Sequence, residues 1–247
     1  MSLLSDLRPC AGCRGAHGPL CPRCRHGLRG PAVRVDRAPA LPLPVVAAAV
    51  YDGPVREALV AFKDHARWGL RRPLGEALHR AFLNLVTGRF RYVPPPDVVD
   101  SLGGAVPDLS CYGGPGDVRR FLLVPVPSSP ASARERDGHH VRELAVRVEE
   151  LSGLDVETVP GLVVVRHRRD QVGLGAAARA ANRQGSMAAT DVLLRRAARP
   201  GTGVVVVDDL VTTGATLVEA DRALRAGGIR PWGAAVVAAT PHLRGLR

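Results

Sequence analysis

The sequence predicts an α/β protein in which a parallel sheet is flanked by helices and preceded by a small cysteine-rich module. Apolar runs of strand length alternate with segments of helical spacing, which implies parallel strands joined by right-handed crossovers. The runs at 121–126 and 203–209 are continuously apolar, as expected of parallel strands buried on both faces. Four cysteines within residues 10–24 mark the separate module.

The sequence predicts two parts of the chain and the strands and helices of the larger part. Residues 1–30 form the cysteine module and residues 31–247 the α/β domain; the proline-rich stretch 31–44 predicts an extended connector. The loop or insertion at 93–117 is rich in proline and glycine. Hydrophobic periodicity predicts strands at 45–51, 121–126, 162–165, 203–209 and 234–239, and helices at 55–66, 70–86, 141–151, 176–183 and 215–226.

The chain is strongly basic, with a formal net charge of +11. This charge indicates a polyanionic partner such as nucleic acid, or compositional drift toward arginine in a GC-rich coding background. Of the 34 Lys and Arg residues, only Lys63 is a lysine. A site that requires a compact ammonium would retain it; the alternative is chance retention on a solvated helix face.

The cysteines form two pairs, Cys10-x-x-Cys13 and Cys21-x-x-Cys24. Paired C-x-x-C turns converge on one Zn²⁺, and a site closed by four thiolates is structural rather than catalytic. Disulfides are the alternative, disfavoured in a reducing cytosol. A cytoplasmic location is expected, because no apolar run reaches the roughly 18 residues that span a bilayer and the first residues lack a secretory signal.

The strongest functional signal is the stretch from Val204 to Thr216: four valines, two acids, a Thr- and Gly-containing loop, and a helix start. Ligands bind at the carboxyl ends of parallel strands, and unpaired N–H groups at a helix N-terminus attract phosphate. Asp208 and Asp209 would accept hydrogen bonds from sugar hydroxyls or help to hold Mg²⁺. Neither a P-loop nor a dinucleotide fingerprint is present. The alternative is a strand–helix turn that is acidic and Thr-rich by chance.

This stretch resembles the motif with which type I phosphoribosyltransferases bind phosphoribosyl pyrophosphate (PRPP). The resemblance implies that Asp208 and Asp209 contact the ribose hydroxyls and serve catalysis, and that Mg²⁺ accompanies PRPP. It also implies that the loop wraps the 5-phosphate, the complete motif being Asp208, Asp209, Leu210, Val211, Thr212, Thr213, Gly214, Ala215 and Thr216.

Nearly the whole chain resembles the ComF family of competence-associated, phosphoribosyltransferase-like proteins. The likeness rests on the four cysteines, Tyr51-Asp52-Gly53 with Ala61-Phe62-Lys63, Val124-Pro125-Val126-Pro127, and the pattern of Gln171, Leu174, Arg179 and Asn182. Where the family often has Arg-Gly-Phe-Asn, this chain has Arg136-Asp137-Gly138-His139-His140. The resemblance implies a role in DNA uptake with single-stranded DNA as a partner.

Further residues are candidates for the remainder of a transferase site. Lys63, Arg134 and Arg136 would stabilise pyrophosphate as it leaves, although the two arginines also fit an exposed loop. Gln171, Arg179 and Asn182 would face the second substrate. Arg179 and Asn182 lie one helical turn apart and equally fit a surface pair. His139 and His140 are acid–base candidates or simply polar residues at a helix start.

Three functions are therefore compatible with the sequence. The first is a phosphoribosyltransferase with an unknown acceptor, the second a non-catalytic single-stranded DNA-binding factor, and the third a PRPP or nucleotide sensor without turnover. Few aromatic residues are available for base stacking, which counts against the second function. Fold alone does not choose among them.

Overall fold

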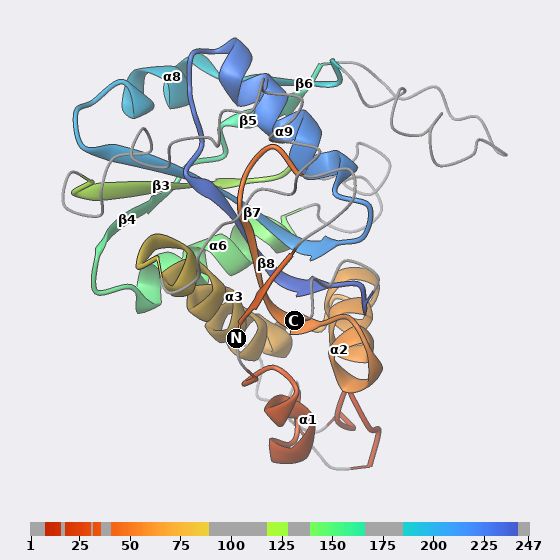
Figure 1. Ribbon diagram of the computed structural model, residues 1–247. Helices are drawn as coiled ribbons and strands as arrows, with labels where there is room; N and C mark the ends of the chain where they lie inside the picture. The colour runs from red at the N-terminus through yellow and green to blue at the C-terminus, as the bar shows by residue number, and fades with distance from the viewer. Residues whose placement is uncertain are drawn as a thin grey trace, which may run out of the picture.

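A six-stranded sheet forms the centre of the protein in the computed structural model, which describes residues 8–15, 18–30, 32–35, 41–88, 118–127, 139–165 and 185–241 (Figure 1). The strand order is β1 (Val33–Arg34), β2 (Val45–Val50), β8 (Gly233–Ala239), β7 (Thr202–Val211), β3 (Arg120–Pro125) and β4 (Asp155–Thr158). Five strands are parallel, and only the edge strand β1 runs antiparallel to β2. The predicted α/β architecture is thus confirmed.

Helices cover both faces of this sheet (Figure 1). Valines 205 and 207 of β7 belong to the core beneath α2 (Gly53–Asp64), α3 (Arg71–Val86) and α6 (His140–Leu151). Valines 204 and 206 belong to the opposite core, with α8 (Asp191–Ala197) and α9 (Ala215–Ala226). Because successive side chains of a strand point to opposite faces, four consecutive valines are required to fill both cores.

Most expected elements lie where hydrophobic periodicity placed them. The strands at 45–51, 121–126, 203–209 and 234–239 are β2, β3, β7 and β8, and the helices at 55–66, 70–86, 141–151 and 215–226 are α2, α3, α6 and α9. The expected helix at 176–183 and the loop at 93–117 lie outside the described residues.

One expected strand belongs to a different sheet. Residues 162–165 give β5 (Leu162–Val164), which pairs antiparallel with β6 (Met187–Ala189) in a separate two-stranded sheet. The position in the main sheet next to β3 is taken instead by β4, which the sequence did not reveal because only Val156 is buried among its four residues. An edge strand needs only one apolar face, so its pattern is weak.

The cysteine module packs directly on the α/β domain. It contains the short helix α1 (Pro22–His26), and Cys24 and Leu28 belong to the same core as Val55 of α2. Arg67, which follows α2, donates from Nη2 to the carbonyl oxygen of Pro9 at 2.7 Å. Within the described ranges, no helix is long and apolar enough to cross a bilayer.

Candidate functional site

The two acids lie at the carboxyl end of the central strand β7. Pairing between β3 and β7 ends at Pro125 and Val207, whereas β8 continues beside β7 as far as Val211. Asp208 and Asp209 therefore stand just beyond the end of β3. Asp208 is half-buried, and its Oδ1 accepts a hydrogen bond from the backbone N–H of Asp209 at 2.8 Å, whereas the side chain of Asp209 is only 4% exposed.

Two side chains from different helices converge on Asp209. Lys63, in the last turn of α2, places Nζ 3.0 Å from Asp209 Oδ2 and 3.4 Å from Oδ1. His140, the first residue of α6, places Nε2 3.3 Å from the same Oδ2. The cluster thus joins β7, α2 and α6 at the carboxyl edge of the sheet, while the Lys63 side chain remains 37% exposed.

The surroundings of the two acids shift their pKa values in opposite directions. Burial by itself raises the pKa of Asp209, but the hydrogen bond from His140 and the charge of Lys63 outweigh it and lower that pKa. Burial and the adjacent charge of Asp209 raise the pKa of Asp208 well above its ordinary value. Burial lowers the pKa of Lys63, yet the charge of Asp209 more than offsets this, so the ammonium is retained.

The loop after β7 has the form of a phosphate cradle. Thr212 and Thr213 are exposed, and α9 begins at Ala215. Gly214 has a φ of +71°, which favours glycine, and a Cβ on this residue would lie 2.5 Å from Leu41 Cδ2 and force that side chain to shift. The N-cap residue Gly214 has no side chain, and the backbone N–H of Ala215 donates a long hydrogen bond, 3.4 Å, to Thr213 Oγ1. The helix N-terminus and the threonine hydroxyls therefore offer donors to an anion.

Thr240 holds this loop from the neighbouring strand. Its backbone N–H donates to Val211 O at 3.1 Å, and its hydroxyl donates to Thr212 O at 3.4 Å. The loop is thus anchored at the end of β8, next to the end of β7. Nothing in the local sequence pattern singled out Thr240 or Leu41, because both come from distant segments of the chain.

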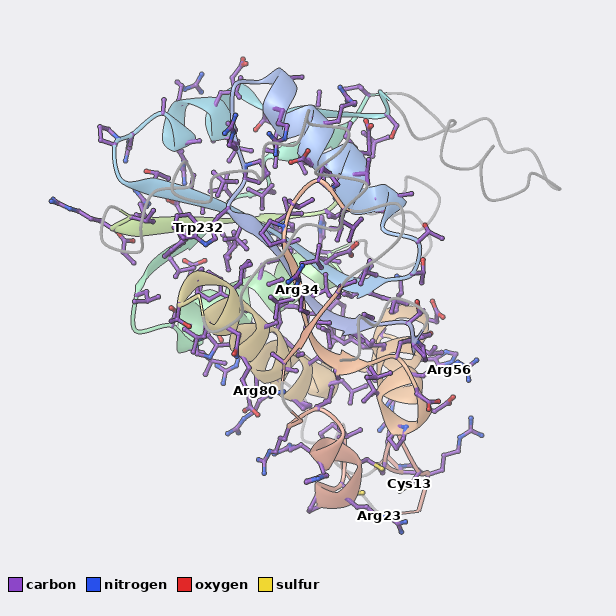
Figure 2. All side chains as sticks on the ribbon, in the orientation of Figure 1. Cys13, Arg23, Arg34, Arg56, Arg80 and Trp232 are labelled. Atoms are coloured by element: carbon purple, nitrogen blue, oxygen red, sulfur yellow. The ribbon has the colours of Figure 1, made fainter. Side chains whose placement is uncertain are left out.

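The four cysteines of the module form one compact cluster. Their sulfurs all lie within 4.8 Å of one another without a disulfide, and Figure 2 shows Cys13 in the module below α2. The sulfurs of Cys13 and Cys21 are 3.8 Å apart. Two thiolates bound at about 2.3 Å in tetrahedral geometry are separated by about the same distance. The cluster therefore has the donor set and the spacing for a structural Zn²⁺.

Backbone donors favour the ionised form of one of these thiols. Burial raises the pKa of Cys10, but N–H groups of Cys21, Cys13 and Gly12 outweigh it and lower the pKa to about 6. One of these contacts is the hydrogen bond from Cys21 N–H to Cys10 Sγ at 3.2 Å. A thiolate is the species that a metal ion requires.

The structure brings together only some of the residues that the sequence predicted. Lys63, Asp208, Asp209 and the Thr-Gly loop meet at one edge of the sheet. His140 joins them as a direct partner of Asp209, a contact that sequence reasoning missed, and His139 beside it is exposed. The remaining predicted residues, Arg134, Arg136, Gln171, Arg179 and Asn182, lie outside the described residues.

Comparison with known proteins agrees with this arrangement. No curated protein matches the chain significantly. Residues 143–247, which include β7, the acid pair, the Thr-Gly loop and α9, match the family model of the phosphoribosyl transferase domain. The C-terminal part of the chain is therefore similar to a phosphoribosyl transferase domain, and a four-cysteine cluster capable of binding zinc stands near the N-terminus.

Proposed function

We propose that the protein binds PRPP and transfers its phosphoribosyl group to an acceptor, with release of pyrophosphate. The observation that carries this proposal is a carboxylate, Asp208, near the end of β7, followed by a Thr-Gly loop and the N-terminus of α9. A phosphate site and a hydrogen-bond acceptor for a diol, side by side, suit a ribose 5-phosphate. The match to the phosphoribosyl transferase domain supports the same ligand class.

Each group has a distinct task in this reaction. The loop from Thr212 to Thr216 holds the 5-phosphate, and Asp208 accepts hydrogen bonds from the ribose hydroxyls. The acceptor attacks the anomeric carbon, the bond from that carbon to the pyrophosphate oxygen breaks, and pyrophosphate leaves with the electron pair. Lys63 stabilises the negative charge that develops on it. Holding the reactants in this alignment supplies much of the rate enhancement.

Two metal ions belong to the proposal. Asp208, a partly exposed oxygen ligand, suits the Mg²⁺ that would arrive with PRPP and neutralise pyrophosphate charge. Zn²⁺ suits the four cysteines and would fold the module. The roles of Arg134 and Arg136 toward pyrophosphate, and of Gln171, Arg179 and Asn182 toward the acceptor, remain predictions.

We further propose that the chain is a member of the ComF family, with the cysteine cluster as module 1–30 ahead of a phosphoribosyltransferase-like domain. A second function, binding of single-stranded DNA, is favoured by the net charge of +11. A DNA-binding role requires an affinity that falls steeply as salt rises. Fluorescence anisotropy with an oligonucleotide at two salt concentrations measures this directly, and binding absent even at low salt rejects the role.

Calorimetric titration of PRPP with Mg²⁺ into the zinc-loaded protein tests the proposed function. We expect saturable binding that Asp208→Asn weakens by roughly tenfold or more, since a charged hydrogen-bond acceptor is lost. Asp191→Asn, which removes a carboxylate from the exposed start of α8, is the matched control and should bind normally. Pyrophosphate release is then measured with nucleobases and amines as acceptors. Absence of PRPP binding to the folded protein refutes the proposal.

A further inference from the structure

The two adjacent acids face opposite sides of the sheet. Asp209 continues the series of Val205 and Val207, whose side chains lie in the core beneath α2 and α6. Asp208 continues the series of Val204 and Val206, which face α9. The Thr-Gly loop and the start of α9 are therefore on the side of Asp208. The two carboxylates cannot approach one ribose in equivalent ways.

Asp209 already has two partners from within the protein. Its side chain is 4% exposed, and Lys63 and His140 both lie within hydrogen-bond distance of its Oδ2. A buried carboxylate is tolerated only when it is paired in this way. With a side chain only 4% exposed, Asp209 offers little access to a sugar hydroxyl.

Lys63, in contrast, has capacity left for a ligand. Its ammonium has three N–H donors, and the Lys63 side chain stays 37% exposed while it contacts Asp209 Oδ1 and Oδ2. Asp209 thus anchors the cation while leaving part of it open to an anion at the sheet edge. A compact ammonium on an anchored stem acts as a point charge, which arginine does not reproduce.

His140 and its aromatic neighbours fix the same arrangement from the other side. The imidazole is buried and meets the ring of Phe62 edge-on, with centroids 6.5 Å apart. Phe62 precedes Lys63 in α2, and its ring also meets Trp68 edge-on at 5.6 Å. The end of α2 is therefore held to α6 by ring contacts and to β7 by the ion pair.

From this geometry we infer that Asp209 is a positioning residue rather than a ribose ligand. Its carboxylate holds Lys63 of α2 and His140 of α6 at the carboxyl edge of the sheet, so that the Lys63 ammonium meets the pyrophosphate group. Asp208 alone supplies the carboxylate that contacts the ribose. The inference rests on the proposed PRPP site for its ligands but not for the ion pair itself.

Because Lys63 is the sole lysine, it can be observed by itself. Reductive methylation with ¹³C-formaldehyde gives one side-chain NMR signal, and the α-amino signal is distinguished by its titration near pH 8. The groups that act electrostatically on Lys63 are Asp209, Asp208 and Asp64, with His140 acting through Asp209. We expect the Lys63 signal of the full-length, zinc-loaded protein to titrate at higher pH than in the urea-unfolded protein.

Two variants show which carboxylate raises the titration pH of the Lys63 signal. Asp209→Asn should abolish the upward shift, whereas Asp64→Asn, the matched control that removes a nearby charge, should reduce it only slightly. If the Lys63 signal of the wild-type protein titrates as in the unfolded chain, the inference is overturned. This comparison needs no variant, so it tests the ion pair even if Asp209→Asn does not fold. An equal effect of Asp64→Asn and Asp209→Asn would also overturn it.

Ribose 5-phosphate and pyrophosphate, titrated separately, test the different roles proposed for Asp208 and Asp209. With ribose 5-phosphate, Asp208→Asn should lose roughly tenfold or more in affinity and Asp209→Asn less than about twofold. With Mg²⁺-pyrophosphate, Asp209→Asn should match Lys63→Met, and the double variant should bind no more weakly than Lys63→Met alone. Equal losses of ribose 5-phosphate affinity in Asp208→Asn and Asp209→Asn refute the inference. If wild-type protein binds neither ligand, the proposed function fails, and the Lys63 titration still judges the ion pair.

Discussion

Gly214→Ala provides a sharp test of the loop geometry, because two separable costs arise at this residue. The φ of +71° is left-handed, which costs an L-residue about 1–2 kcal/mol. In addition, the new Cβ would lie 2.5 Å from Cδ2 of the buried Leu41, so this side chain would have to shift within the core. Overpacking of this kind costs about 1–3 kcal/mol. The expected loss in the free energy of unfolding is therefore about 2–5 kcal/mol.

Gly228→Ala is the matched control for the backbone cost. Gly228 has a similar φ of +78°, and a Cβ there would meet nothing within 4 Å. Urea unfolding should show a loss of only about 1–2 kcal/mol for this variant. In a double-mutant cycle, Gly214→Ala should cost less in the Leu41→Ala background than in the wild-type protein, because the clash is removed. If Gly214→Ala and Gly228→Ala are equally destabilised, the close approach of Leu41 to the loop is wrong.

Three further predictions concern the metal cluster, the acid pair and a buried carboxylate. Cys24→Ser should abolish stoichiometric zinc binding and lower the melting temperature by roughly 5–10 °C. Arg23→Ser, at the exposed neighbouring residue, should change neither. If the metal-free protein melts at the same temperature as the zinc-loaded protein, the zinc is not structural. Because the folded state raises the pKa of Asp208, it binds more protons there than the unfolded state, so this residue makes the protein less stable as pH rises. Asp208→Asn should therefore raise the urea midpoint at neutral pH while it weakens PRPP binding, and an unchanged midpoint would argue against the raised pKa. Glu219 of α9 is buried, accepts hydrogen bonds from the N–H groups of Gly185 and Met187 at 3.1 and 2.9 Å, and pairs with Arg222. Glu219→Ala should therefore lower the free energy of unfolding in urea by about 3 kcal/mol. A loss below about 1 kcal/mol would show that these contacts contribute little.

Features carried by local patterns could be predicted from the sequence. The Val204–Val207 run predicted a central strand because parallel strands buried on both faces have continuously apolar segments. The Cys-x-x-Cys pairs predicted the cysteine cluster because a tight turn brings two sulfurs to one point. The Thr-Gly loop was visible for a similar reason, since the strand, the turn and the helix start are consecutive in the chain.

The tertiary structure alone decided which distant residues meet. Lys63 and Asp209 are 146 positions apart and come together because β7 lies in the middle of the sheet, with the ends of α2 and α6 above its carboxyl edge. The same strand order placed β4 rather than β5 beside β3. No local pattern encodes strand order, because it follows from how whole apolar faces are buried together. The sequence by itself therefore determined the fold class and the candidate phosphate loop, and only the packing of the sheet against its helices gave Asp209 partners different from those of Asp208.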